Sequence, residues 1–231
     1  MSKPKLVVLS GAGISAESGI ATFRDSDGLW ENHKVEDVAS PEGWKKNPEL
    51  VQNFYNQRRK RALEVVPNPA HHIIKELEDK FEVLIITQNV DNLHERAGSS
   101  NVMHLHGELF LVRSEKYPEL IYPISKINSN GWELKMGDLC EKGFQLRPHI
   151  VWFGEEVPMI KKASQEVLMA DVLVVVGTSL QVYPAAGLIG YTDRNCKKFI
   201  VDPKIPNFSE KNWIKIEEKA STGMKKVQEQ L

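Results

Sequence analysis

LVVLSGAGISAESGIATFR, residues 6–24, carries the strongest indication of how this chain folds. An apolar run at residues 6–9 passes directly into a glycine-rich turn that reads G-x-G-x-x-A over residues 11–16. A tight strand-to-helix turn favours glycine, because glycine adopts positive φ and lets backbone amides approach a pyrophosphate at a helix N-terminus. The pattern is typical of a dinucleotide-binding turn, although many α/β proteins turn a strand with glycine and bind nothing there.

The segment after this turn does not favour a dehydrogenase. Such an enzyme places an acidic residue roughly 20 positions further on, at the end of a second strand, where it holds the adenosine ribose. Here residues 26–40 read SDGLWENHKVEDVAS, which contains acidic residues but no strand before them. The glycine turn therefore indicates nucleotide binding better than it indicates hydride transfer.

Three further apolar runs, at residues 83–86, 172–176 and 198–201, resemble the first. Because they are nearly continuous in β-branched residues rather than alternating, they predict strands buried on both faces of a parallel sheet. Helical patterns lie at residues 69–80, 91–97, 157–170 and 219–231. We expect an α/β fold with a Rossmann-like doubly wound parallel sheet, whose ligands bind beyond the carboxyl ends of the strands.

Two stretches interrupt the alternation of strands and helices, and we expect them to form a smaller inserted lobe within one domain of residues 1–231. The small lobe would comprise about 25–68 and 108–148. The large lobe would comprise about 1–24, 69–107 and 149–231.

Composition excludes several classes of partner. The chain has 231 residues with 30 basic and 31 acidic side chains, a balance that favours neither nucleic acid nor an anionic membrane. No apolar run approaches the ~18 residues of a membrane span, and MSKPKLVVLS is expected to be a first strand rather than a signal peptide. Two distant cysteines, Cys140 and Cys196, provide no disulfide framework, so we expect a cytoplasmic protein.

Five segments occur in an order that resembles the sirtuins, the NAD-dependent protein-lysine deacylases. They are GAGISAESGIATFR (11–24), TQNVDNLHERAG (87–98), HLHGEL (104–109), LRPHIVWFGEEVP (146–158) and GTSLQVYPAAG (177–187). The resemblance extends from residue 6 to about residue 220. It implies that NAD is consumed as a co-substrate and that the partners are acylated-lysine proteins or peptides.

Polar residues stand where a ligand of this fold would lie. Gln88, Asn89 and Asp91 directly follow a buried strand, although Asp91 could also cap a helix. The resemblance implies that Asn89 positions the nicotinamide ribose and a water, and that Asp91 holds the carboxamide. The residues that it assigns to NAD are Gly11, Ala12, Gly13, Ser15, Ala16, Phe23, Arg24, Trp30, Gln88, Asn89, Val90, Asp91, His106, Gly177, Thr178, Ser179, Asp202 and Ala220.

The segment HLHGEL contains two candidates for a general base. Strand-like alternation places His104 and His106 on the same side, so spacing does not distinguish them. The resemblance assigns the base to the histidine before glycine, which is His106, and makes Asn89 and Asp91 its catalytic companions. It implies that the acyl oxygen attacks C1′ of the ribose as nicotinamide leaves. It further implies that the resulting imidate links the peptide to ADP-ribose and that His106 takes a proton from a ribose hydroxyl, which attacks the imidate. Hydrolysis then releases free lysine and O-acyl-ADP-ribose.

Two segments are expected to bind the acylated lysine. By resemblance, Val151, Phe153, Gly154 and Glu155 form an extended groove edge that pairs with the peptide; the alternative is a core strand with a buried Trp152.

Tyr55 and Arg58 share a helix face at i, i+3 spacing. A basic helix face is usually only solvated, but the Tyr-x-x-Arg pair resembles that of bacterial desuccinylases and demalonylases, where both side chains grip a distal carboxylate. We therefore expect succinyl- or malonyl-lysine as substrate, with acetyl-lysine also possible.

The small lobe departs from the zinc-binding pattern of most sirtuins. It holds one cysteine, Cys140, where the family has four, and it has no histidine between His106 and His149. Structural zinc needs four ligands, so we expect no metal. An apolar set is expected to stabilise the lobe instead: Tyr117, Leu120, Ile121, Tyr122, Ile124, Ile127, Trp132, Leu134 and Phe144.

Three other functions remain open from the sequence: a mono-ADP-ribosyltransferase of the same fold, a plain deacetylase, and a non-enzymatic reader of NAD or acyl-lysine. The Tyr55/Arg58 pair favours an acidic-acyl deacylase, because a transferase has no need of it. The presence of Asn89, Asp91 and His106 argues against a reader. The sequence leaves the oligomeric state undetermined.

Overall fold

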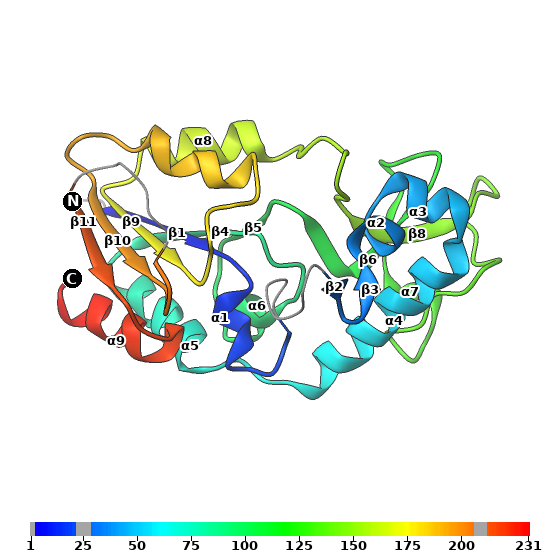
Figure 1. Cartoon of the computed structure of the whole chain (residues 1–231), viewed down its shortest axis with the longest axis horizontal. Coiled ribbons are helices and arrows are strands. Elements are labelled where there is room, and N and C mark those ends of the chain that lie inside the picture. Colours follow the sequence, from blue (N-terminus) through cyan, green and yellow to red (C-terminus); the bar gives the residue numbers. More distant parts are fainter. Residues whose placement is uncertain (1–2, 22–28, 206–211) are drawn as a thin grey trace.

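A computed structural model describes residues 3–21, 29–205 and 212–231 (Figure 1). Its main feature is a parallel sheet with strand order β11-β10-β9-β1-β4-β5. The chain runs outward from β1 through β4 to β5, returns to β9 on the other side of β1, and continues to β11. This reversal is that of a doubly wound sheet and confirms the predicted Rossmann-like α/β fold. The strands are β1 Lys5–Ser10, β4 Glu82–Thr87, β5 Val102–His104, β9 Val172–Val176, β10 Lys197–Val201 and β11 Trp213–Ile216.

The four apolar runs of the sequence form β1, β4, β9 and β10, the centre of the sheet. The two edge strands, β5 and β11, were not predicted. Both are short, and neither contains the continuous β-branched run that marks a strand buried on both faces.

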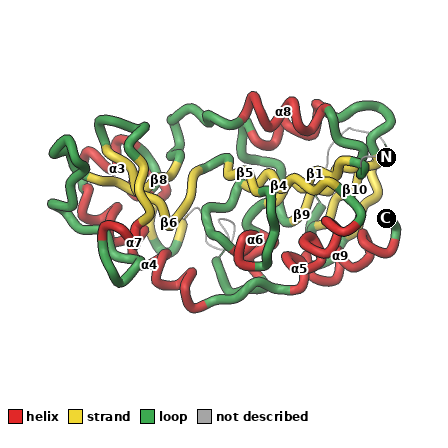
Figure 2. Tube along the Cα trace, turned by 180° about the vertical axis from the view of Figure 1, so that it is seen from behind, coloured by secondary structure: helices red, strands yellow, loops and turns green. Residues whose placement is uncertain are grey.

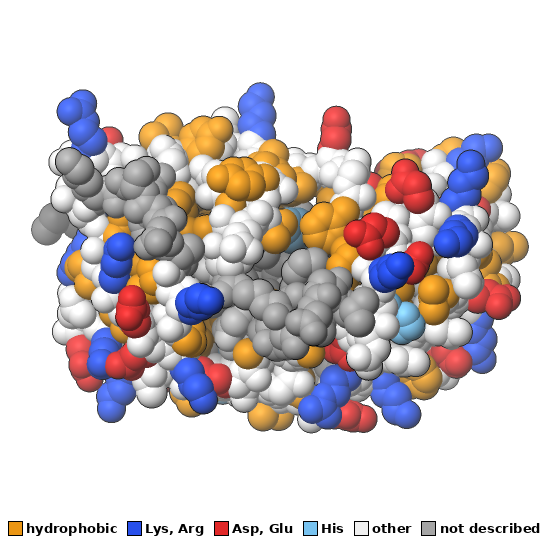
Figure 3. All heavy atoms as spheres, viewed as in Figure 1, with side chains coloured by type: hydrophobic (Ala, Val, Ile, Leu, Met, Phe, Trp, Pro, Cys, Tyr) orange, Lys and Arg blue, Asp and Glu red, His pale blue; other side chains and the backbone are white. Residues whose placement is uncertain are grey.

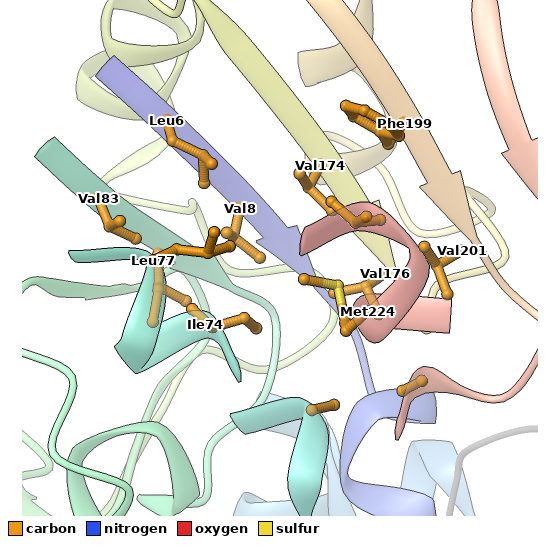
Figure 4. Packing of buried hydrophobic residues seen from close by; sticks show 14 of the residues in the cluster. Leu6, Val8, Ile74, Leu77, Val83, Val174, Val176, Phe199, Val201 and Met224 are labelled. Carbon is orange, nitrogen blue, oxygen red and sulfur yellow. The ribbon is translucent and has the colours of Figure 1, made fainter. Parts of the chain in front are cut away.

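Helices cover both faces of this sheet (Figures 1 and 2). One layer consists of α5, Pro69–Glu76, and α9, Ala220–Glu229; α8, Ile160–Leu168, and the 3-10 helix η2, Ala185–Tyr191, form the other. Alternate residues of β1 serve the two layers. Leu6 and Val8 pack with Ile74 and Met224 in one core cluster (Figure 4), whereas Val7 and Leu9 pack in the other. Each face of the sheet is thus a hydrophobic core.

The predicted helices are present but shorter than their patterns. The pattern at 69–80 divides into α5 and a 3-10 turn, η1 Leu77–Asp79, and residues 91–97 contain only α6, Leu93–Arg96. Gly98 ends α6 with φ +95, as its position predicts. The small α1, Gly13–Ala16, follows the glycine turn.

A smaller lobe, built largely of helices and short strands, adjoins the carboxyl edge of the sheet (Figure 1). It confirms the predicted inserted lobe; the residue boundaries of the two lobes stay a prediction. Its strands form a three-stranded antiparallel sheet, β7-β6-β8, and a β2–β3 pair. Its elements are β2 Leu29–Trp30, β3 His33–Lys34, α2 Val35–Val38, α3 Pro41–Lys46, α4 Pro48–Glu64, β6 Gly107–Ser114, β7 Ile121–Pro123, α7 Ile124–Ile127 and β8 Leu146–Ile150.

The far end of this lobe has an apolar core that includes much of the predicted set. Ile124 and Leu134 are buried beside Cys140, and partly buried residues pack against them. Ile121, by contrast, is 42% exposed and points outward from its short strand. On the surface drawn in Figure 3, basic and acidic side chains are interspersed, as the balanced charge of the sequence indicates.

Candidate functional site

A cavity of about 660 Å³ lies at the carboxyl ends of the sheet strands and extends to α4 of the smaller lobe. Ligands of doubly wound sheets bind at this edge, where the strand order reverses. Every predicted site residue that the structure describes lines this cavity; Phe23 and Arg24 lie outside the described residues. The lining members are Gly11, Ala12, Gly13, Ser15, Ala16, Trp30, Tyr55, Arg58, Gln88, Asn89, Val90, Asp91, His106, Val151, Phe153, Gly154, Glu155, Gly177, Thr178, Ser179, Asp202 and Ala220.

The glycine turn is needed for close packing, not for positive φ. Neither Gly11 nor Gly13 has positive φ, so that part of the sequence argument is wrong. A Cβ on Gly13 would lie 2.7 Å from Gly177 Cα, and one on Gly11 would lie 2.7 Å from Thr178 Cβ. Their amides also donate within the protein, to Val176 O at 3.1 Å and Gly177 O at 2.8 Å. The ends of β1 and β9 therefore meet backbone to backbone.

Gly177 is the glycine of this edge that does need an unusual conformation. Its φ is +64, and a Cβ there would lie 2.3 Å from Ile14 N. Its own amide donates to Val201 O at 2.9 Å, which ties β9 to β10. Small residues at these strand ends give the cavity a wall of backbone, which suits a large polar ligand such as a dinucleotide.

Asn89 and Asp91, both buried, form a hydrogen-bonded group with Ser15. The Asn89 amide donates to Gly11 O and to Ser15 Oγ, each at 3.1 Å, and Ser15 Oγ donates to Asp91 Oδ2 at 3.1 Å. Asp91 Oδ1 accepts from the N–H of Leu93, the first residue of α6, at 3.1 Å, but the N-cap of that helix is Asn92 rather than Asp91. Burial raises the pKa of Asp91. Since both Asn89 amide protons are donated internally, its Oδ1 is the atom left to accept from a ligand.

Two further contacts continue the site across the sheet edge. Gln88 Nε2 donates to Thr178 Oγ1 at 3.1 Å and so joins the ends of β4 and β9. At the end of β10, Asp202 is buried and its Oδ1 accepts from Lys204 N at 2.9 Å. Ala220, the first residue of α9, lines the cavity beside them.

The structure distinguishes the two histidines that spacing could not. His104 has both ring nitrogens in contacts within the protein: Nδ1 with Asn89 O at 2.9 Å and Nε2 with Glu95 Oε1 at 2.7 Å. His106 lines the cavity, and its Nδ1 donates to Gln88 O at 3.0 Å, a contact that leaves Nε2 as the unprotonated nitrogen. Burial lowers the pKa of His106, which favours its neutral form.

Tyr55 and Arg58 both face the cavity from α4, as their spacing predicts. Tyr55 is fully buried, and its hydroxyl oxygen accepts from Trp152 Nε1 at 3.1 Å. The Arg58 guanidinium stacks over Trp30, 4.3 Å from the ring centroid, and contacts Glu31 Oε1 at 3.4 Å. Its Nε is buried without a hydrogen-bond partner. Desolvation raises the pKa of Tyr55 to about 12 and lowers the pKa of Arg58.

The backbone is not extended through all of residues 151–155, whereas the predicted pairing of this segment with a substrate peptide stays a prediction. Strand β8 ends at Ile150, and the chain then turns, with Glu155 N donating to Trp152 O at 3.0 Å and Gly154 at φ +90. Glycine at position 154 allows this turn, and Trp152 is buried, as the alternative interpretation expects.

Glu155 lines the cavity but is tied to the protein. Its carboxylate accepts from Arg147 Nη1 at 2.8 Å, from Arg113 Nη2 at 3.2 Å and from Trp152 N at 2.8 Å. Its predicted contact with substrate stays a prediction. These hydrogen bonds indicate that Glu155 holds the turn that contains Trp152 in place.

Sequence reasoning missed two side chains that contact Arg58 and Tyr55 in the cavity wall, Glu31 and Trp152. Glu31 occupies a β2–β3 turn with φ +51, where no local pattern signals an ion pair with a residue 27 positions away. Trp152 was taken only as a core residue, because nothing in VWFGE indicates a hydrogen bond to α4.

No group of three or more potential metal ligands occurs among residues 3–21, 29–205 and 212–231. None of the helices in those ranges is both long and apolar enough to cross a membrane. The prediction of a zinc-free protein stays open to direct analysis.

Comparisons with known proteins agree with this geometry. The Sir2 family model matches residues 11–184. An NAD-dependent protein deacylase of Helicobacter pylori is 58% identical over 202 residues, covering 87% of this chain and 86% of the relative. A crystal structure of a Sir2 homologue with NAD is 38% identical, with TM-score 0.86, covering 99% of this chain and 89% of that one. A Sir2 mutant bound to a peptide and NAD is 31% identical, with TM-score 0.81, over 99% and 93% of the two chains. The chain belongs to the Sir2 family, the sirtuins.

Proposed function

We propose that this NAD-dependent protein-lysine deacylase removes acidic acyl groups, succinyl or malonyl, from lysine side chains. The observation that carries the proposal is a pair of donor groups in the cavity wall, the Tyr55 hydroxyl and Arg58 Nε, for which the described residues provide no acceptor.

The Tyr55 hydroxyl accepts from Trp152, and its own proton has no acceptor among the described residues. Arg58 Nε is buried and unpartnered, and its side chain is only 11% exposed. A buried donor without an acceptor is unfavourable by about 1–3 kcal/mol. A ligand carboxylate would relieve both donors, because the planar guanidinium offers a fork and the phenol adds one more donor.

Glu31 neutralises Arg58 only in part. Its carboxylate is 44% exposed and contacts Arg58 at 3.4 Å, which is long for a charge-assisted hydrogen bond. Solvent screening keeps such a pair weak. A substrate carboxylate can therefore compete with it for the guanidinium.

The residues at the other end of the cavity suit the chemistry of NAD cleavage. Bound NAD supplies a ribose carbon that accepts the acyl oxygen as nicotinamide leaves. We propose that His106 Nε2 takes the proton of a ribose hydroxyl, because Nδ1 is held by Gln88 O and burial lowers the pKa of the ring. Asn89 Oδ1 would accept from the ribose or a water, and Asp91 would hold the carboxamide.

A plain deacetylase and a mono-ADP-ribosyltransferase are the alternatives on this fold. Neither has a use for the donors of Tyr55 and Arg58, which is why we favour the acidic-acyl enzyme. We also propose the cytoplasm as its location, since both cysteines are free.

The test compares Arg58 with a second basic residue of the same helix, Lys60. Arg58→Met should lower the succinyl-to-acetyl ratio of kcat/KM by about one to two decades, as expected for loss of a charge-assisted partner. Lys60→Met removes an exposed cation of the same helix that does not line the cavity, and it should leave that ratio within about twofold. Equal losses on both peptides in Arg58→Met would mean that Arg58 supports the fold or NAD, and the enzyme would be a plain deacetylase.

A further inference from the structure

Trp152 is a nearly fully buried residue of the cavity wall, to which its neighbours Tyr55 and Arg58 also belong, and its indole N–H donates to the Tyr55 hydroxyl oxygen at 3.1 Å. We propose that Trp152 is a positioning residue for acyl selectivity, because it turns the Tyr55 proton toward the distal carboxylate of the substrate. This inference rests on the proposed acidic-acyl function and adds a residue that acts through Tyr55.

The donor and acceptor inventory fixes the direction of the contact. An indole nitrogen can only donate, so Trp152 must occupy a lone pair of the phenol oxygen. Tyr55 then has to give its single proton elsewhere. A phenolic hydroxyl can otherwise rotate to bond with different neighbours, but here the hydrogen bond from Trp152 fixes the orientation of the Tyr55 hydroxyl. Trp152 and Tyr55 are 2% and 0% exposed, so water does not compete for this bond.

Trp152 is itself held at its ring and at its backbone. The Arg147 guanidinium lies 3.3 Å from the indole ring centroid. The same guanidinium binds Glu155 at 2.8 and 3.2 Å, and Glu155 accepts from the backbone amide of Trp152 at 2.8 Å. The indole therefore cannot turn away from Tyr55 without breaking charge-assisted contacts.

The stacked Arg147 guanidinium also strengthens the hydrogen-bond relay, by which we mean the bond from Trp152 to Tyr55 and the bond from Tyr55 to the substrate carboxylate. A guanidinium over an indole face draws electron density from the ring, which makes the N–H a better donor. Successive hydrogen bonds polarise one another in a low-dielectric interior, so a stronger bond from Trp152 to Tyr55 makes the Tyr55 proton a better donor in turn. A succinyl or malonyl carboxylate can accept this stronger hydrogen bond from Tyr55, whereas an acetyl methyl group has no acceptor atom for it.

A double-mutant cycle on the full chain tests the relay through the succinyl-to-acetyl ratio of kcat/KM. Trp152→Phe keeps an aromatic ring but removes the N–H, and it should lower the ratio about three- to tenfold, mainly through KM for the succinyl peptide. Tyr55→Phe should lower the ratio at least as much, and the double variant should equal Tyr55→Phe alone. Trp44→Phe is the matched control, since Trp44 packs 5.9 Å from Trp152 but donates to Glu115 instead. It should leave the ratio unchanged.

Additive effects in the cycle, or equal losses of both activities in Trp152→Phe, would overturn the relay. If Arg58→Met lowers the succinyl-to-acetyl ratio but Trp152→Phe does not, the relay is overturned and the proposed function stands. If the wild-type enzyme does not prefer the succinyl peptide, both the relay and the proposed function are overturned.

If Trp152→Phe does not fold, the wild-type protein labelled with 15N at its indole nitrogens gives a second test. One indole N–H resonance should shift both in Tyr55→Phe and on addition of succinyl-lysine peptide, but not on addition of acetyl-lysine peptide. Indole resonances that respond equally to both peptides would overturn the proposal.

Discussion

Replacing His106 with alanine should separate catalysis from NAD binding. We propose His106 Nε2 as the base, because Nδ1 donates to Gln88 O at 3.0 Å and burial lowers the pKa of the ring. We expect His106→Ala to lose deacylation while it still binds NAD, since the proton is taken after NAD is seated.

The magnitude follows from general base catalysis. A positioned base contributes about 10²–10⁴-fold, or roughly 3–5.5 kcal/mol of transition-state stabilisation. The variant also leaves Gln88 O without its imidazole donor, at a cost of about 1–3 kcal/mol in stability. The loss in kcat/KM should therefore exceed the loss that destabilisation of the fold alone would produce. Urea unfolding measures the change in folding stability separately.

The assay follows nicotinamide release and peptide mass, with NAD affinity measured by calorimetry. His104→Gln is the control, because His104 bonds to Asn89 O and Glu95 and does not line the cavity. It should lower kcat/KM less than tenfold. Equal losses in the two folded variants, or a His106→Ala protein that no longer binds NAD, would refute the assignment of the base.

Four further predictions follow from the same structure. Because burial lowers the pKa of His106, the acid limb of kcat/KM against pH should lie below about 6.5, and a limb above that value would show that burial does not govern this pKa. Glu31→Gln removes the carboxylate that competes for Arg58, so KM for succinyl-lysine peptides should fall about two- to fivefold; an unchanged KM would place Glu31 outside substrate binding. Gly13→Ala brings a Cβ to 2.7 Å from Gly177 Cα, and urea unfolding should show a loss of roughly 1–3 kcal/mol, whereas wild-type stability would contradict the close packing. Elemental analysis should find no zinc, and near-stoichiometric zinc whose removal unfolds the protein would overturn that expectation.

Much of the fold could be predicted because the central strands are buried on both faces. Such strands read as continuous apolar runs, as residues 172–176 do, whereas β5 and β11 are short edge strands without that signal. Helix lengths were overestimated because an apolar periodicity continues into turns, as at residues 77–79.

The positions of the candidate site residues follow from topology, because parallel strands bring their carboxyl ends to one edge. Long-range side-chain contacts do not follow from local patterns. The bond from Trp152 to Tyr55 spans 97 residues, and the Glu155 carboxylate is held by bonds that its sequence neighbours do not reveal. Spacing likewise gave no sign that the ring nitrogens of His104 are both held within the protein, whereas only Nδ1 of His106 has such a contact among the described residues.

The most direct measurement is mass spectrometry of the purified protein with matched succinyl- and acetyl-lysine peptides, with and without NAD. NAD-dependent loss of the acyl mass, with one nicotinamide released per free lysine and a higher kcat/KM for the succinyl peptide, is the predicted result. Acyl loss without NAD, or nicotinamide release that leaves the peptides acylated, would contradict it.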